Sequence, residues 1–291
     1  MSKIKKLLAA TDFSDNAQQA ATRAAMLASA SDAKLELLHV MSSSSLDDLR
    51  QFFGLSTEAD DKLKDEALQT LKSQAQHITQ QTGQTITPQL RVGQTDSEIL
   101  SAAEDADMLV IGARGANPLR DIFLGTTAEK LLRKSSCPVL VNKRPPLAPY
   151  QRVMVTMDLV SDSAAALEMA RRIAPDASAA VVHVFSVPFE GKLWVAGVSD
   201  ADIQRHRNQA RLQASESLRA IMASLDPAPD FPLVIAHGDP TWVILEQQDA
   251  LNPDLIIVSK RRRSAMGDML LGSVTRHILS YSRCDVLIVP E

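Results

Sequence analysis

Several features that chains of this length often carry are scarce or absent here. Of the 291 residues only Cys137 and Cys284 are cysteines, and neither has cysteine or histidine neighbours at metal-ligand spacing. Each stands just before the last apolar run of its half of the chain. The pattern therefore predicts buried packing residues and argues against a disulfide framework.

Long apolar runs and an excess of positive charge are also absent. No run approaches the ~20 apolar residues that cross a bilayer, and the N-terminal stretch lacks the apolar core and cleavage site of a secretory signal. Residues 1–146, the first half, have a formal charge of −1, and residues 147–291, the second half, have −3. We expect a cytoplasmic protein with no membrane or nucleic-acid partner.

Familiar motifs for phosphate binding and catalysis are missing too. The turn after the first apolar segment, Ala9 to Asp12, has no G-x-G-x-x-G, and no G-x-x-x-x-G-K-[S/T] occurs anywhere, which excludes NAD-type and P-loop sites. The histidines show neither metal spacing nor a Ser/His/Asp arrangement. His39 and His183 stand on apolar strands, and we expect hydrogen-bonded core residues. No catalytic residue is predicted, and metal ligands are left undetermined.

Strand-like apolar segments alternate with helical patterns along the first half. This alternation predicts a parallel sheet with right-handed crossovers and helices on both faces, a doubly wound α/β fold. The expected strands are residues 4–10, 34–41, 85–92, 108–111 and 138–142. Ser14 or Asp15 is expected to cap the first helix. The later helices are expected at residues 58–81, at residues 95–105, and from near Thr126 to Lys134.

The second half repeats the first. Residues 143–150, KRPPLAPY, form a proline-rich linker, after which residues 153–173 repeat the pattern of residues 7–27. Residues 108–141 and 255–288 align without a gap at an offset of 147. The repeat predicts two tandem domains, residues 1–144 and 150–291. Their last strands, Val139–Val141 and Val286–Val289, are short and apolar, and we expect them to pair.

One stretch of the first half has the spacing of a phosphate cradle. The segment from Met108 to Ile111 is a buried strand, Gly112 and Gly115 follow in a loop, and Gly125-Thr126 opens a helix. Glycines let backbone amides approach a ligand, and a helix N-terminus attracts anions. A tight loop that merely joins strand to helix would explain the same residues.

With its G-x-x-G, nine residues, G-[S/T] spacing, the chain resembles the universal stress protein family over nearly its whole length. The resemblance implies five-stranded parallel sheets of order 3-2-1-4-5 and an ATP site at the carboxyl ends of strands one and four, with Mg²⁺ as a further candidate. The nucleotide-binding set that it implies is Ala10, Thr11, Asp12, Val40, Ile111, Gly112, Arg114, Gly115, Gly125, Thr126 and Thr127.

The resemblance also implies a role for the main members of this set. Val40 contacts adenine through its backbone, while Asp12 accepts a ribose hydroxyl or helps to hold a metal ion. Gly112 and Gly115 pass beneath the ribose and phosphates, and Arg114 supplies charge. Thr126 and Thr127 donate to the β- and γ-phosphates. The alternative for Thr11 and Asp12 is a helix-capping turn.

The second half departs from the motif. Ser259 replaces Gly112, Arg262 replaces Gly115, and the run Lys260–Arg263 is basic. This run is either a solvated turn or a group of cations that neutralise an anion. We expect one adenine nucleotide per chain, bound by the first domain.

Three functions agree with these patterns. The first is a cytoplasmic stress-response protein that binds ATP and acts as a regulator or protective factor, with slow hydrolysis at most, so that the protein is not an ordinary enzyme. The others are a nucleotide-dependent hydrolase or transferase and a nucleotide-free adaptor. Apolar loops at 46–55 and 189–198 favour a covered surface and a homodimer, alongside an unknown protein partner.

Overall fold

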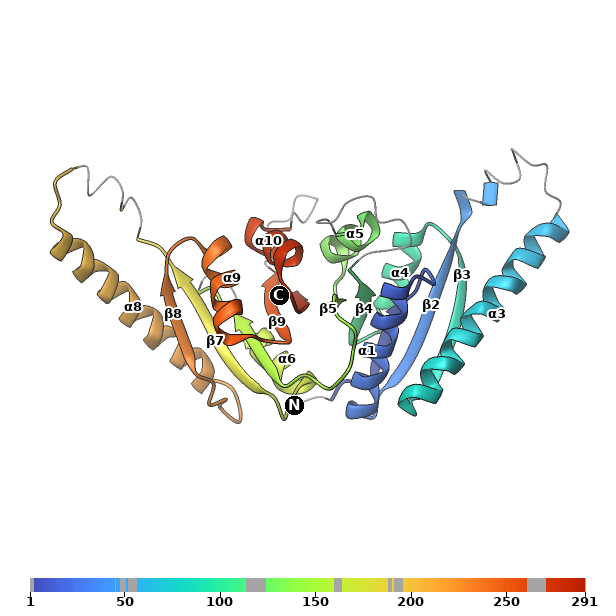
Figure 1. The fold of residues 1–291 in the computed structure, drawn as a ribbon, viewed down its shortest axis with the longest axis horizontal. Coiled ribbons are helices and arrows are strands. Elements are labelled where there is room, and N and C mark those ends of the chain that lie inside the picture. Colours follow the sequence, from blue (N-terminus) through green and yellow to red (C-terminus); the bar gives the residue numbers. More distant parts are fainter. Residues whose placement is uncertain are drawn as a thin grey trace. The chain divides into compact units, whose positions relative to one another are not determined.

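The computed structural model describes residues 3–44, 46–47, 51, 57–113, 124–159, 164–187, 190, 196–260 and 271–290. Strands and helices alternate in both halves, as predicted (Figure 1). The elements of the first half are β1 Lys6–Ala10, α1 Asp15–Ser31, β2 Lys34–Ser42, α3 Thr57–Thr82, β3 Ile86–Gly93, α4 Thr95–Ala103, β4 Met108–Gly112, α5 Thr126–Lys134 and β5 Val139–Asn142. Those of the second are β6 Arg152–Thr156, α6 Ala164–Ile173, β7 Ser178–Phe185, α8 Asp200–Ala223, β8 Leu233–His237, α9 Pro240–Leu251, β9 Leu255–Lys260, α10 Ser273–Tyr281 and β10 Asp285–Pro290.

The sheet of the first half is parallel, with its strands in the order β3-β2-β1-β4-β5. Helices α1 and α3 pack on each other, as do α4 and α5, and right-handed crossovers place these pairs on opposite faces. In the second half, β9, β6, β7 and β8 are parallel neighbours in that order. The doubly wound α/β class is confirmed.

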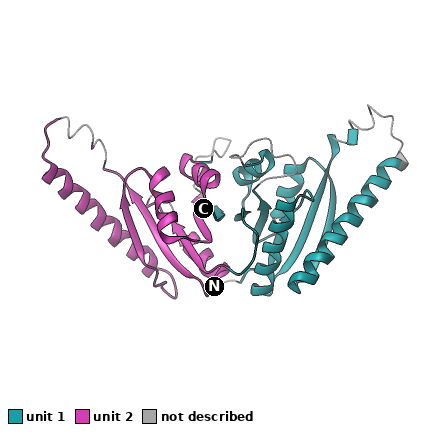
Figure 2. Cartoon of the chain, in the orientation of Figure 1, with its two compact units in different colours: residues 1–149, 263–271, 283–290 teal, residues 150–262, 272–282, 291 magenta. Residues whose placement is uncertain are grey.

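The chain divides into two compact units, drawn in different colours in Figure 2. Unit 1 contains Met1–Pro149, Arg263–Leu271 and Arg283–Pro290, and unit 2 contains Tyr150–Arg262, Gly272–Ser282 and Glu291. The main boundary lies in the proline-rich segment that the sequence marks as a linker. A cut at the linker alone would leave β10 in the second unit, yet this last strand is part of unit 1.

Strand β10 joins unit 1 by pairing with β5. The two strands are antiparallel, with Leu287 opposite Leu140 and the flanking residues of one strand opposite those of the other. The predicted pairing of the two last strands is therefore confirmed. Leu140 and Leu287 are also equivalent positions of the repeat. The antiparallel pair is therefore centred on the same repeat position in both strands.

Burial explains why these segments form strands and helices. Residues 108–110 of β4 are fully buried, as expected of a parallel strand that is covered on both faces. On α1 the predicted face of small residues is buried against the sheet, where alanines allow close approach. The Oγ atom of Ser14 caps this helix by accepting from Ala17 N at 3.3 Å. At the far end of α3, Gly83 has φ +75°, which confirms the glycine stop.

Both cysteines have the predicted structural role. Cys137 and Cys284 are buried and are not in a disulfide, and burial raises the pKa of Cys137. Ser135 Oγ donates to the carbonyl oxygen of Cys137 at 2.9 Å. These contacts fit packing residues.

Two further sequence predictions concern the apolar loops and membrane spans. Leu46 is buried, but most of the loops 46–55 and 189–198 lies outside the described residues. Within the part of the chain that the structure describes, every helix is too short or too polar to cross a bilayer.

Candidate functional site

The sheet brings the first group of predicted residues to one edge. Strand β1 lies between β2 and β4, with Ala10 opposite Leu38 and Ala9 opposite Val110. Just beyond β1, the N–H of Thr11 still donates to Leu38 O at 2.9 Å. The carboxyl ends of the three strands therefore place residues 10–12 beside Val40 and near the end of β4.

The turn between β1 and α1 is held by its own polar side chains. Thr11 Oγ1 donates to Gln74 Oε1 at 3.0 Å and accepts from Phe13 N at 3.1 Å. Asp12 Oδ1 accepts from Ser14 N at 3.1 Å and from Ser14 Oγ at 2.6 Å. The capping turn, which the sequence offered as an alternative for Thr11 and Asp12, is thus present at both residues. Gln74, which comes from α3, was not predicted, because nothing in the local sequence links it to β1.

An aromatic contact fixes the same turn. Phe13 has φ +66°, an uncommon conformation for a bulky residue. Its ring stacks on His39, with 4.1 Å between the ring centroids. His39 Nδ1 donates to Thr11 O at 2.8 Å, and burial lowers the pKa of His39. His183 likewise donates to a carbonyl oxygen, that of Met157. Both histidines are hydrogen-bonded to backbone carbonyls, as predicted, with His183 buried and His39 half-buried.

Gly112 has a structural reason to be glycine. A Cβ atom there would lie 3.0 Å from the backbone carbon and oxygen of Asn16 and 3.2 Å from Ala17 N. The end of β4 therefore packs directly against the first turn of α1, and Ile111 just before it is 4% exposed. This packing supports the alternative that the glycine serves the fold, and it leaves a role toward a ligand as a prediction.

The two described ends of the segment between β4 and α5 lie close together. Gly125 N donates to Ala113 O at 3.4 Å, so the start of α5 lies next to the end of β4. Gly125 is the N-cap and makes no side-chain hydrogen bond, and Thr126 and Thr127 are exposed. A helix N-terminus without a capping side chain offers N–H donors and positive dipole to an anion. Arg114 and Gly115 lie outside the described residues.

A polar cleft of about 450 Å³ opens at this edge. Sequence reasoning found only Thr127 among its lining residues. The available signal was that one polar triplet begins at the last residue of β2 and another directly follows β3, and the carboxyl ends of these strands share one edge of the sheet. The other lining residues are Ser42, Ser43, Ser44, Gln94, Thr95, Asp96 and Lys130.

Charges of both signs surround the cleft. Helix α4 also begins there, and its N-cap Gln94 makes no capping hydrogen bond. Asp96 lies 3.8 Å from Lys130 Nζ and 3.6 Å from Lys134 Nζ, so one carboxylate faces two ammonium groups. The N-termini of α4 and α5 add partial positive charge at the same place, while Glu98 and Glu129 in their first turns add negative charge.

The corresponding region of unit 2 has different side chains. Gly272 caps α10 as Gly125 caps α5, again without a side-chain hydrogen bond. Beside it, His277 contacts Trp242 and Tyr281, with ring centroids 4.7 and 4.5 Å apart. Ser259 stands where Gly112 stands in unit 1, and residues 261–263 of the basic run lie outside the described residues.

A second polar group in unit 2 lies at the carboxyl ends of β7 and β8. Glu190 accepts from His237 Nε2 at 2.8 Å through Oε2 and pairs with Arg207 through Oε1. The ring of Phe185, the last residue of β7, packs edge-on against His237. This carboxylate already has two cationic or donor partners, so the group differs from the open helix terminus of unit 1.

Comparisons with known proteins agree with this architecture. The model of the universal stress protein family matches residues 3–143 and again residues 149–290. Universal stress protein MJ0531 of Methanocaldococcus jannaschii is 32% identical over 148 residues, covering 48% of this chain and 83% of that protein. A universal stress protein of Mycolicibacterium smegmatis is 24% identical over 298 residues, covering 97% of this chain and 96% of that one.

A solved structure extends the likeness in fold to the whole chain. The crystal structure of a universal stress protein from Archaeoglobus fulgidus has a TM-score of 0.68 at 21% identity, covering 99% of this chain and 97% of that one. Because the family model matches twice and spans nearly all residues, the chain belongs to the universal stress protein family and is of the tandem type.

Proposed function

We propose that the first half of the protein binds one adenine nucleotide, ATP, and that the protein acts as a regulator or protective factor in the stress response. The observation that carries this proposal is the open N-terminus of α5 beside a polar cleft that Lys130 lines. It lies at the edge where β1, β2 and β4 end, and ligands of doubly wound sheets bind at such edges. The cytoplasmic location, the homodimer and slow hydrolysis at most stay predictions from the sequence.

The donor set fits a polyphosphate. Thr126 and Thr127 present hydroxyl and backbone N–H groups, and Lys130 one turn later adds a charge that is 54% exposed. Val40, near the end of β2, would contact adenine through its backbone. Asp12 would face the ribose, although its Oδ1 atom already accepts two hydrogen bonds from Ser14. The site supplies positioning and charge, which suits binding and regulation.

Mg²⁺ would depend mainly on the phosphates for its ligands. Among the described residues, no group of three histidine, cysteine, aspartate or glutamate side chains lies close enough to hold a metal ion. Mg²⁺ commonly takes one or two carboxylates together with substrate phosphates. Asp12 is the carboxylate at this edge that the sequence marked for that role.

A matched pair of charge substitutions tests the proposal. Thr126→Glu places a carboxylate at the first residue of α5, where it favours the helix dipole but repels phosphate. Ser273→Glu makes the same change at the equivalent position of α10. Titration calorimetry of the full chain with ATP, with and without magnesium, should give a stoichiometry near one. Thr126→Glu should abolish binding, and Ser273→Glu should leave it unchanged.

Two results would contradict the proposal. A stoichiometry of two would place a nucleotide in each half, and binding that survives Thr126→Glu would remove α5 from the site. Thermal denaturation of both variants checks that they are folded, since a carboxylate at a helix N-terminus should preserve or slightly raise stability.

A further inference from the structure

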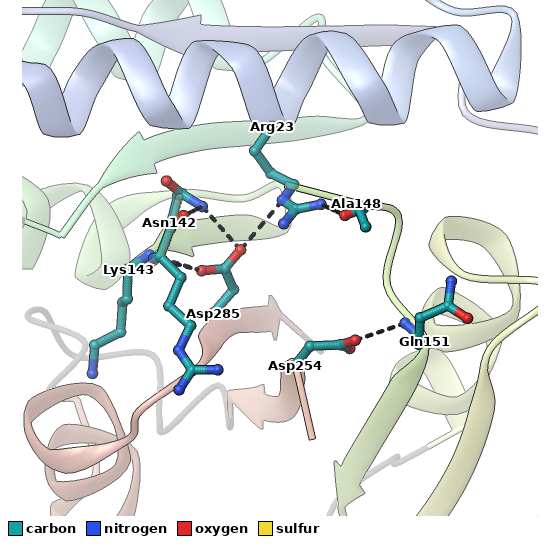
Figure 3. A network of polar contacts seen from close by, with 8 residues as sticks. Arg23, Asn142, Lys143, Ala148, Gln151, Asp254 and Asp285 are labelled. Carbon is teal, nitrogen blue, oxygen red and sulfur yellow. Dashed lines mark hydrogen bonds and ion pairs between the residues drawn. The ribbon is translucent and has the colours of Figure 1, made fainter. Parts of the chain in front are cut away.

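A buried carboxylate anchors the last strand of the chain to unit 1 (Figure 3). Asp285, at the start of β10, is 1% exposed. Its Oδ2 atom accepts from Asn142 Nδ2 at 2.9 Å and lies 3.4 Å from Arg23 Nε. Its Oδ1 atom accepts from the backbone N–H groups of Lys143 at 2.8 Å and Arg144 at 3.2 Å. One side chain thus connects helix α1, strand β5 and the segment that follows it.

The positive partner of this carboxylate is buried as well. Arg23 lies on the sheet-facing side of α1 with its side chain 6% exposed, and its Nη1 atom donates to Ala148 O at 2.7 Å. Removing one member of a buried ion pair is strongly destabilising, because the other member stays buried without compensation. The strand that lies beside β5 must therefore supply a carboxylate opposite Arg23.

The two halves of the repeat contribute different members of this network, and neither half has all of them. The position equivalent to Asp285 in the first half is Pro138, and the position equivalent to Asn142 in the second half is Val289. In the helices, Arg23 corresponds to Met169, which is buried on α6 as Arg23 is on α1. The first half thus has the arginine and the asparagine, and the second half has the carboxylate.

The apolar residues of the pairing do not distinguish β10 from β5 of a second copy. Strand β10 presents Val286, Leu287 and Ile288 to β5, whose own residues are Val139, Leu140 and Val141. Because the pairing is centred on the equivalent residues Leu140 and Leu287, a β5 strand from a second copy of the chain would fit the same apolar register. Hydrophobic burial alone would accept either strand.

We propose that the edge of β5 is a docking surface that selects its partner strand by the Asp285 carboxylate. Its occupant is β10 of the same chain, and β5 of a second copy is rejected. A second β5 would bring Pro138 to the place of Asp285, and Arg23, Asn142 and two backbone N–H groups would lose that acceptor. The network thereby directs first halves away from pairing with each other.

Cross-linking of the full chain tests this selection. In a background with Cys137→Ala and Cys284→Ala, Leu140→Cys reports β5–β5 pairing, because two copies in that register bring residue 140 of each chain opposite the other. The triple change Arg23→Met, Asn142→Val and Asp285→Pro copies the residues of the opposite half and erases the selection. After refolding at high concentration under mild oxidation, interchain disulfide should rise about ten-fold or more in the triple variant.

Asp254→Asn is the matched control. Asp254 Oδ2 accepts from Gln151 N at 2.7 Å in unit 2, and its repeat equivalent, Asp107, makes the same kind of contact with Lys5 N in unit 1. This carboxylate occurs in both halves, so its loss should lower stability without raising the yield of interchain disulfide. Equal yields in the control and the triple variant would overturn the proposal, as would a triple variant with no increase.

A stability cycle keeps the proposal testable if the triple variant folds poorly. Asp285→Asn should raise the unfolding equilibrium constant of the full chain about a hundred-fold, since it removes the charge opposite Arg23. In an Arg23→Met background the same change should have a much smaller effect. Independent, additive effects of the two substitutions would show that the ion pair does not set the preference and would overturn the proposal.

Discussion

The helix pair α4–α5 of unit 1 and the pair α9–α10 of unit 2 are equivalent elements of the repeat with different surfaces. Between α4 and α5, Asp96 faces Lys130 and Lys134 beside a polar cleft. Between α9 and α10, the ring of His277 packs against those of Trp242 and Tyr281, and Trp242 is 63% exposed. Lys130 and His277 are equivalent positions, as are Lys134 and Tyr281.

Comparing the two helix pairs separates the features that both halves share from those that differ. Both helices α5 and α10 begin after a glycine N-cap in an extended conformation, so the two halves share this helix start. The exposed faces are free to change, and one has become charged while the other is aromatic. An anion site therefore depends on the side chains beside the helix terminus, and only unit 1 has a lysine there among these equivalent positions.

Within this comparison, the largest expected effect concerns Gly112, whose equivalent in unit 2 is Ser259. Gly112→Ser, which introduces the residue found at position 259, should destabilise the protein by about 2 kcal/mol because its Cβ meets the backbone of Asn16. Gly272→Ala is the control, since the nearest atom to a Cβ there is 4.0 Å away, and its cost should stay within about 0.5 kcal/mol. Urea denaturation measures both. Similar costs would mean that the end of β4 adjusts more easily than its packing implies.

The aromatic cluster should contribute less. Trp242→Ala removes the edge-on contact with His277 and should cost about 1 kcal/mol, the usual worth of an aromatic pair. Leu147→Ala is a control for loss of exposed apolar surface, because Leu147 is 90% exposed. Denaturation of both variants should show a loss for Trp242→Ala alone. Equal losses of stability in the two variants would show that the aromatic contacts do not stabilise the protein.

The charged cluster should contribute less again. Asp96→Asn removes two contacts with exposed lysines, which are worth about 0.5 kcal/mol at low salt. The difference from the native protein should shrink in high salt, where exposed charges are screened. Asp61→Asn, which removes an exposed pair with Lys64, should have a smaller effect at either salt concentration. A cost of Asp96→Asn that salt leaves unchanged would assign Asp96 a role in packing.

The smallest effect is expected from pH. Burial lowers the pKa of His39 in the folded protein, so the unfolded chain takes up the proton first as pH falls below about 6.5. The contribution of His39 to stability is fully present above that pH and is lost as pH falls toward the folded pKa. His39→Gln should flatten this part of the stability profile, and His206→Gln, at an exposed position, should not. A profile that His39→Gln leaves unchanged would exclude His39 as its source.

The elements of the fold were predictable because their signals are local and periodic. Helix α3 was expected at 58–81 and spans Thr57–Thr82, since its pattern is long and Gly83 ends it. The glycine cap of α5 was predictable for the same reason. The serines of the cleft and Gln74 were missed, because their place in the site depends on which strand ends and helices become neighbours.

The sequence by itself determined the class of fold, the duplication, the buried cysteines and the candidate helix terminus at Thr126, since each follows from apolar periodicity or from the backbone freedom of glycine. Only the tertiary structure decided that Asp12 and Thr11 cap the turn before α1 and that Gly112 packs against Asn16. Tertiary structure also placed Asp285 against Arg23. The two residues are far apart in the chain, and a buried charge reveals its role only when its partner is known.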